Sequence, residues 1–362
     1  MKIKLLNVYW MLAYAFQCLD EREAKEYTSE DFDNVLNLFG KILANGLAKQ
    51  VKQGLAREYI GCDSDIFSPR GQILMAGTMQ HWLNRRKLVS CSVDEYTEDH
   101  YANQILKSVA TMLIQQPSLD EKVRTELRHV LAFFQTVSTT DLRHVSWNRL
   151  NYNRNNGNYR MLIGLCRLIV DGMIVNDSGH CMFRLREFVN NERLFELYEK
   201  FLFEFFRKHF PQITVSHSQI DWALGHDNQE TELLPLMQSD IMLSYRGKTL
   251  IVDAKYYSRP LIKNSRFSDA KPTLNSSNMY QIYTYVKNFD SDNSGNVSGM
   301  LLYVKASGPS PDADYMIGGN RISAKTLDMD CPFEDIKAQL FALAEDWLRY
   351  ALPEGPVPCP VS

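Results

Sequence analysis

The sequence predicts an α/β protein of two domains, and three observations lead to that prediction. The chain has 362 residues, more than one typical domain holds. Helical periodicity dominates its first half, whereas closely spaced apolar runs typical of strands mark the second. A helical pattern precedes these runs and another interrupts them. We therefore expect a mixed α and β domain at residues 1–190, and a mixed sheet flanked by helices at 191–362.

Composition limits the classes of function. With 45% hydrophobic and 23% charged residues, the chain is neither disordered nor a disulfide scaffold. The net charge of −3 gives no overall positive field, so nucleic acid would have to be held by local patches or with the help of a partner. Seven scattered cysteines without C-x-x-C or zinc-like spacing favour a reduced, cytoplasmic protein.

The apolar run at residues 5–19 predicts a packed amphipathic helix. Asn7 and Gln17 interrupt it, and it is shorter than a membrane span, so we expect neither a signal peptide nor a membrane segment. Further periodic segments follow in the first half, with a strand-like piece at residues 88–93. The helical segments are 35–53, 101–115, 121–134 and 161–170.

An arginine-rich segment ends the first half. Between Arg143 and Arg186 the chain carries seven arginines and two aspartates, and within this segment residues 148–160 read as a loop. Its arginines suit phosphate contacts and its tyrosines suit stacking on bases. The candidates for DNA binding are Arg149, Arg154 and Arg160. A solvated connector is the open alternative.

The second half predicts a helix, three strands, a helix and a strand. The long helix spans 192–209, and a strand at 213–220 follows it. The later strands are 239–245, 249–257 and 299–304, and the second helix is 279–289. This order is that of a modest α/β sandwich.

A tight turn brings two acids together. The strands 239–245 and 249–257 are joined through Arg246-Gly247, which suits a two-residue hairpin turn. In that register Asp240 lies opposite Asp253 on the same face, with side-chain roots about 5 Å apart. Two carboxylates so placed repel each other unless a cation lies between them, and Mg²⁺ favours one or two carboxylates with water.

Lys255 shares the face of Asp253 because side chains alternate along a strand. The side chain of Ala254 points to the opposite face, while its backbone carbonyl remains available to the metal. A metal and an ammonium in one pocket can activate water beside a phosphodiester and stabilise the negative charge that develops.

At this point the chain resembles the PD-(D/E)xK nuclease superfamily. Asp240 matches the first acid, although Ser239 replaces the usual proline before it, and Asp253-Ala254-Lys255 matches the D-x-K element. Gln281 and Tyr285 resemble the Q-x-x-x-Y helix of the RecB-like branch, whose residues line the active site; a polar helix rim is the alternative. The superfamily often takes a further metal-binding acid from the preceding helix, for which Glu199 is the candidate.

The wider chain resembles the McrC family of McrBC-type modification-dependent restriction systems. The most specific segments are 6–16 and Ile251-Val-Asp-Ala-Lys-Tyr-Tyr257. The resemblance implies a DNA endonuclease that uses Mg²⁺, with Mn²⁺ as a substitute. It also implies a hexameric McrB-like AAA+ GTPase as partner, which recognises modified cytosine in double-stranded DNA and receives the N-terminal half of this chain in its central channel.

No nucleotide-binding motif occurs in the chain itself, so any nucleotide dependence would come from the partner. We therefore expect an endonuclease subunit that also stimulates the hydrolysis of nucleotide by the motor. Two alternatives stay open at this stage. One is a nuclease-fold adaptor that activates the motor without cutting DNA, and the other is a stand-alone RecB-like nuclease.

Overall fold

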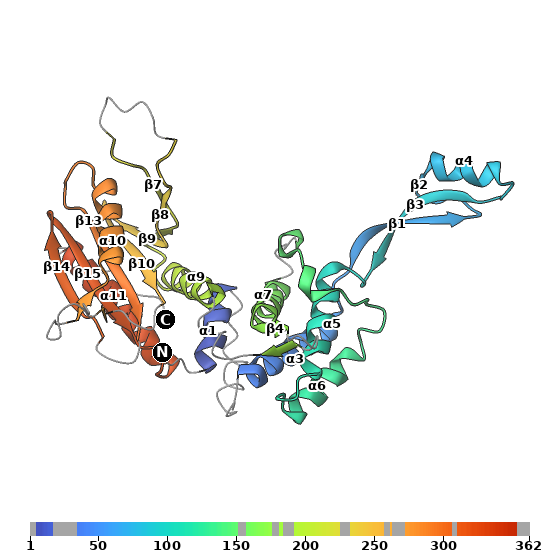
Figure 1. Ribbon diagram of the computed structural model, residues 1–362, viewed down its shortest axis with the longest axis horizontal. Coiled ribbons are helices and arrows are strands. Elements are labelled where there is room, and N and C mark those ends of the chain that lie inside the picture. The colour runs from blue at the N-terminus through green and yellow to red at the C-terminus, as the bar shows by residue number, and fades with distance from the viewer. Residues whose placement is uncertain are drawn as a thin grey trace. The chain divides into compact units, whose positions relative to one another are not determined.

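The computed structural model describes residues 5–16, 35–150, 157–175, 181–183, 192–224, 232–256, 261–262, 272–305 and 310–352 (Figure 1). The chain forms two compact units. Met1–Asp31 together with Val189–Ser362 make the first, here called the sheet unit, and Phe32–Phe188 make the second, the helical unit. The first 31 residues therefore group with the C-terminal part of the chain, which differs from the expected domain of residues 1–190.

Helix α1 (Leu5–Ala15) explains this difference because it packs against α9 (Glu192–His209). The Asn7 side chain donates hydrogen bonds to the carbonyls of Met329 and Cys331 at 2.8 and 2.9 Å. The Tyr14 hydroxyl is hydrogen-bonded to the imidazole of His209 at 2.8 Å in a buried setting. The predicted N-terminal helix is thus present, and the partners just named lie in the sheet unit.

A six-stranded mixed sheet forms the centre of the sheet unit, in the order β14-β15-β13-β10-β9-β6. The strands are β6 (Thr214–Ser216), β9 (Ile241–Tyr245), β10 (Lys248–Lys255), β13 (Val297–Val304), β14 (Ala313–Ile317) and β15 (Asn320–Leu327). Strands β10, β13 and β15 run parallel, and the other pairs are antiparallel. The mixed sheet flanked by helices that the sequence predicts is confirmed.

One predicted strand is wrong in its extent. Residues 213–220 were expected to form a single strand, but the chain breaks into β6 and β7 (Gln219–Ile220). Strand β7 leaves the main sheet and pairs with β8 (Met237–Gln238) in a separate two-stranded ribbon. An apolar pattern alone does not distinguish one long strand from two short strands in different sheets.

Helices cover both faces of the sheet. Helix α10 (Ser276–Phe289) begins after Asn275, whose side chain accepts a hydrogen bond from the Ser277 amide, and it packs on β13. A Cβ at Gly299 would lie within 2.8 Å of side-chain atoms of Ile282 and Val286, so this glycine permits the close approach of α10. The other face is covered by α9 beside β6, β9 and β10, and by α11 (Phe333–Ala351) beside β15.

The hairpin of β9 and β10 follows the predicted register. Arg246 and Gly247 have φ angles of 47° and 77°, as a type I′ turn requires. Tyr245 pairs with Lys248, and the pairing continues without a slip to Ile241 and Val252. The next position of this register belongs to Asp240 and Asp253.

The helical unit contains the predicted helices with small shifts at their ends. They are α3 (Val35–Gln53), α5 (Tyr101–Ile114), α6 (Glu121–Leu131) and α7 (Gly157–Asp171). Because α7 begins at Gly157, the last residues of the predicted loop 148–160 are helical; residues 147–149 form a 3₁₀ turn, and 151–156 lie outside the described residues. Two short strands, β4 (Met173–Val175) and β5 (Cys181–Phe183), form a ribbon after α7.

A segment that we call the arm, residues 58–97, projects from these helices (Figure 1). It consists of β1 (Glu58–Ile66), β2 (Gln72–Ile73), α4 (Met75–Leu83) and β3 (Val89–Thr97). Of the α4 residues only Thr78 is buried. The large exposed apolar side chains of the arm are those of Tyr59, Phe67, Ile73, Met75, Met79, Trp82, Leu83 and Tyr96.

Across the described ranges, the structure contains no helix with the length and apolar character needed to cross a bilayer.

Candidate active site

The C-terminal end of β10 carries a buried ion pair. Asp253 and Lys255 are 1% and 6% exposed, and Lys255 Nζ lies 2.7 Å from Asp253 Oδ2. They share one face of the strand because they are two residues apart. This face also carries Ile251, whose side chain joins the apolar core beneath α10. The shared face predicted for Asp253 and Lys255 is confirmed.

Asp240 completes the hairpin end of the site. It directly precedes β9, and its Oδ2 accepts a hydrogen bond from the backbone amide of Ala254 at 2.8 Å. This bond fixes Asp240 beside the residue that follows Asp253. The Ala254 amide is therefore the backbone group that contacts Asp240. A metal-binding role for the Ala254 carbonyl stays a prediction.

A chain of hydrogen bonds connects the site to α10. Lys255 Nζ donates to Gln281 Oε1 at 3.0 Å, and Gln281 Nε2 donates to the Tyr285 hydroxyl at 3.0 Å. Both α10 side chains are half-buried. These contacts favour the active-site interpretation of Gln281 and Tyr285 over that of a solvated helix rim.

Glu199 reaches the same charges from α9. Its pKa is raised to about 8, first by burial and then by the negative charges of Asp240 and Asp253. Burial also raises the pKa of Asp253 to about 6, although the Lys255 ammonium opposes the shift. The pKa of Asp240 is raised by burial against the opposing effect of the Ala254 amide. Glu199 therefore lies within the influence of both aspartates, and among the described residues Lys255 is the ammonium that acts on all three carboxyl groups.

A further positive charge would stabilise the carboxylates of the site. Asp253 Oδ1 is buried and has no hydrogen-bond partner among the described residues. A buried, unsatisfied carboxylate oxygen is costly, and a cation is one group that relieves this cost. Within the described ranges no three His, Cys, Asp or Glu side chains are already gathered as a metal site. Asp240 and Asp253 with water nevertheless form the donor set that suits Mg²⁺.

The raised pKa of Glu199 predicts a pH-dependent stability in the absence of metal. In the native state Glu199 keeps its proton up to about pH 8, whereas in the unfolded chain it loses the proton near its usual pKa of 4.5. The free energy of unfolding therefore falls as pH rises through that window. Glu199→Gln has no proton to release at this position, so its free energy of unfolding should not fall in this way. In EDTA, Glu199→Gln and wild type should have nearly the same melting temperature at pH 5. At pH 9 the melting temperature of Glu199→Gln should be a few degrees above that of wild type.

Glu232→Gln is the control for this prediction, because Glu232 is exposed in the same unit and is not among the charges that raise the pKa of Glu199. It reports the effect of removing one negative charge away from the site. An advantage of Glu199→Gln that is the same at pH 5 and pH 9 would contradict the assignment of Glu199 to the carboxylate group.

Two tyrosines beside the site did not emerge from the sequence. Tyr198 and Tyr256 lie next to Glu199 and Lys255 in the chain, and their rings are 5.8 Å apart between α9 and β10. Both hydroxyls are buried without a hydrogen-bond partner among the described residues. Because side chains alternate along β10, Tyr256 lies on the α9 face. This alternation is the feature of the sequence from which Tyr256 could have been predicted.

The arginines predicted to bind DNA lie in the helical unit. The Arg149 guanidinium is 5.8 Å from the centre of the Tyr101 ring, and Arg160 is exposed on α7. Arg154 lies outside the described residues. The structure does not group these residues with the carboxylates, and a role in DNA binding stays a prediction.

Comparisons with known proteins agree with the resemblance seen in the sequence. A family model described as the McrBC 5-methylcytosine restriction system component matches residues 6–304. The chain is 30% identical over 357 residues to the type IV methyl-directed restriction enzyme EcoKMcrBC of Escherichia coli K12. The aligned region covers 96% of this chain and 99% of that protein.

A solved structure of a tetradecameric assembly of Thermococcus gammatolerans McrB AAA+ hexamers with bound McrC is similar in fold. Its TM-score is 0.52 at 16% identity, with 94% of this chain and 76% of that chain covered. The family match over most of the chain and the bacterial relative carry the assignment: this chain belongs to the McrBC 5-methylcytosine restriction system component family.

Proposed function

We propose that this chain is the Mg²⁺-dependent DNA endonuclease subunit of an McrBC-like, modification-dependent restriction system. The observation that carries the proposal is the meeting of Asp240, Asp253 and Lys255 at one end of the β9–β10 hairpin. One buried oxygen of Asp253 has no hydrogen-bond partner among the residues that the structure describes. The family membership supports it, and so does the relative that is named as a methyl-directed restriction enzyme.

Each side chain has a defined task in this proposal. Asp240 and Asp253 hold the cation, and Glu199 contributes further negative charge. When bound, Mg²⁺ polarises a phosphoryl oxygen and lowers the pKa of water. Lys255 stabilises negative charge that develops on the phosphate, and its contacts with Asp253 and Gln281 fix its position. Tyr285 orients Gln281 through its hydroxyl.

We also propose that the helical unit binds a McrB-like AAA+ motor and stimulates its hydrolysis of GTP. The arm supports this proposal because its large apolar side chains are exposed to an extent unusual for a monomer. The family description, which names 5-methylcytosine, and the relative named as methyl-directed support double-stranded DNA with a modified cytosine as the substrate of the complete system. The net charge of −3 agrees with a partner that supplies much of the hold on DNA.

Calorimetric titration of the protein with Mg²⁺ tests the metal site. We expect binding at pH 8 and weaker binding at pH 6, because protons compete for Asp253, whose pKa is about 6, and for Glu199, whose pKa is about 8. Asp240→Asn and Asp253→Asn should each weaken binding strongly. Asp292→Asn, which removes an exposed carboxylate of the same unit, is the control.

Mg²⁺ binding that survives both active-site substitutions would contradict this metal site. No binding at pH 8 would instead favour the alternative of a nuclease-fold adaptor.

A further inference from the structure

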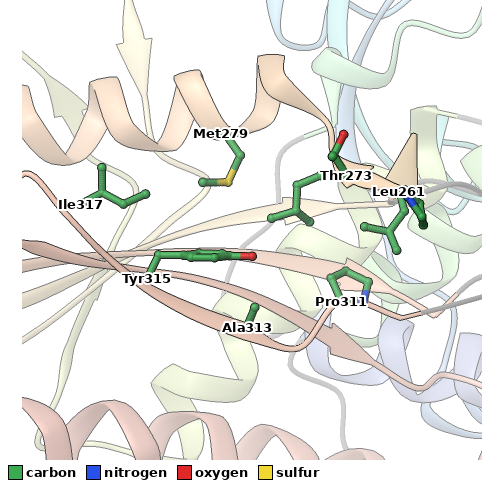
Figure 2. A pocket seen from close by; sticks show the side chains of 9 residues that line it. Leu261, Thr273, Met279, Pro311, Ala313, Tyr315 and Ile317 are labelled. Atoms are coloured by element: carbon green, nitrogen blue, oxygen red, sulfur yellow. The ribbon is translucent and has the colours of Figure 1, made fainter. Parts of the chain in front are cut away.

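The two sides of the six-stranded sheet differ in the regularity of their pairing. On one side β14 pairs with β15 without interruption, and its alternate residues Ala313, Tyr315 and Ile317 line the same apolar cavity (Figure 2). On the other side the pairing of β6 with β9 gives way to the separate ribbon of β7 and β8. Asp240 lies where these two pairings meet, between β8 and β9.

The register of the pairing changes by one residue at that point. Ser216 is the last β6 residue paired with β9, opposite Met242, and Gln219 is the first β7 residue, opposite Gln238. Between these two pairs one segment has two residues, 217–218, and the other has three, 239–241. One extra residue in one strand of an antiparallel pair is a β-bulge, and bulges redirect side chains beside functional sites.

The hydrogen bonds identify Asp240 as the extra residue. Ile241 keeps its regular place opposite Val252 of β10. Ser239 pairs on the other side, because its amide donates to the Ser218 carbonyl at 3.1 Å. In a regular strand, residues that are two apart bond to the same neighbouring strand. Ser239 and Ile241 bond to different neighbours, so the bulge lies at the residue between them.

The Ser239 hydroxyl completes the bulge. It accepts a hydrogen bond from the Ser218 amide at 3.3 Å and donates one to the Ser218 carbonyl at 3.2 Å. In a regular hydrogen-bonded pair, the Ser218 amide would donate to the backbone carbonyl of Ser239. Because the hydroxyl takes the place of that carbonyl, the peptide between Ser239 and Asp240 can turn out of the ladder. Ser239 is 1% exposed, so a buried amide depends on this hydroxyl.

This turn of the chain explains the contact between Asp240 and β10. The residues that flank the two-residue turn of the β9–β10 hairpin form a hydrogen-bonded pair, as does every second pair after them. A regular continuation of this pattern would place the Ser239 carbonyl opposite the Ala254 amide. Because Ser239 pairs with Ser218 instead, the Ala254 amide donates to Oδ2 of Asp240 at 2.8 Å.

We propose that Ser239 is a positioning residue of the metal site, whose hydroxyl closes the bulge and thereby directs the Asp240 carboxylate toward β10. Ser239 itself does not bind the metal and acts through Asp240. Proline, the residue that Ser239 replaces, has neither the amide nor the hydroxyl that bonds Ser218. The effect on the metal rests on the proposed function, whereas the bulge and its hydrogen bonds do not.

Mg²⁺ binding, measured by calorimetry at pH 8, gives the first test. Ser239→Ala removes both hydrogen bonds of the hydroxyl and should weaken binding by about tenfold or more. Ser239→Thr keeps the hydroxyl and should bind Mg²⁺ more tightly than Ser239→Ala. Ser244→Ala is the matched control, because it removes a hydroxyl hydrogen bond, that with Thr249, from the turn end of the same strand. It should bind Mg²⁺ as wild type does.

The backbone amide signal of Ala254 in NMR spectra gives a second test, recorded without metal. In protein with isotope-labelled alanine, this signal is identified by its loss in Ala254→Gly. Asp240→Asn replaces the charged acceptor with a neutral one and should move the signal. Ser239→Ala should move it in the same direction, and Ser244→Ala should leave it in place. If Ser239→Ala does not fold, Ser239→Cys takes its place, because a thiol of similar shape bonds only weakly.

Wild-type Mg²⁺ affinity in Ser239→Ala would overturn the role of Ser239, and so would weakening of the same size in Ser244→Ala. An Ala254 signal that Asp240→Asn moves and Ser239→Ala leaves in place would overturn it as well. Failure of the wild type to bind Mg²⁺ would instead contradict the proposed metal site. The Ala254 signal would then still decide whether Ser239 positions Asp240, so the two failures are distinguishable.

Discussion

Asp253→Asn should abolish DNA cleavage by the complete system, with a fall in rate on the order of 10³-fold or more. The substitution keeps the shape of the side chain and removes the carboxylate that is 1% exposed, paired with Lys255 and available to a cation. In the proposed mechanism this carboxylate holds Mg²⁺, and it also pairs with the Lys255 ammonium. Cleavage of plasmid DNA in the presence of the motor protein and GTP measures the loss.

The same variant should still stimulate the motor, because Asp253 lies in the sheet unit and the arm lies in the helical unit. Its melting temperature must be measured, since the buried Lys255 loses its nearest counter-ion. Asp240→Asn serves as a second variant that leaves the Asp253–Lys255 pair in place. Loss of motor stimulation together with cleavage, in a variant that is folded, would contradict the division of labour between the two units.

Trp82→Ser combined with Leu83→Ser should remove stimulation of the motor and leave Mg²⁺ binding unchanged. Both side chains are exposed on α4, at 59% and 82%, so their loss costs the free chain little stability. A buried aromatic at the centre of an interface typically contributes about 2 kcal/mol or more, which corresponds to at least about 30-fold weaker binding. GTP hydrolysis by the motor, titrated with each variant, measures this.

Leu233→Ser is the control for exposure, because Leu233 is 97% exposed but belongs to the sheet unit. It should stimulate the motor as wild type does. Full stimulation by the double arm variant would show that the exposed surface of α4 is not the docking surface.

The hairpin at the site was predictable because local chemistry determines it. Gly247 permits the positive φ of the turn, and a turn of two residues sets the register of every later pair. Alternation then places Asp253 and Lys255 on one face. The spacing of Gln281 and Tyr285 predicted one helix face but not the hydrogen bond that links Gln281 to Lys255. That bond depends on how α10 packs on the sheet.

Features that depend on distant contacts were not predictable from periodicity. The grouping of α1 with the sheet unit rests on bonds from Asn7 and Tyr14 to residues about 200 or more positions away in the chain. The exposure of Trp82 likewise depends on which neighbours α4 lacks, because an amphipathic pattern does not distinguish a packed face from an unpartnered one. The charge coupling of Glu199 required the position of α9 beside the hairpin.

The most direct test of the account is cleavage of methylated and unmethylated plasmid DNA with Mg²⁺, with and without the motor and GTP, and with Asp253→Asn as control. The account predicts cutting of methylated DNA that requires the motor, GTP and Asp253. Cutting by this chain alone, or cutting that Asp253→Asn retains, would contradict it. Absence of cutting under every condition, with motor hydrolysis still stimulated, would contradict the endonuclease assignment and leave the adaptor.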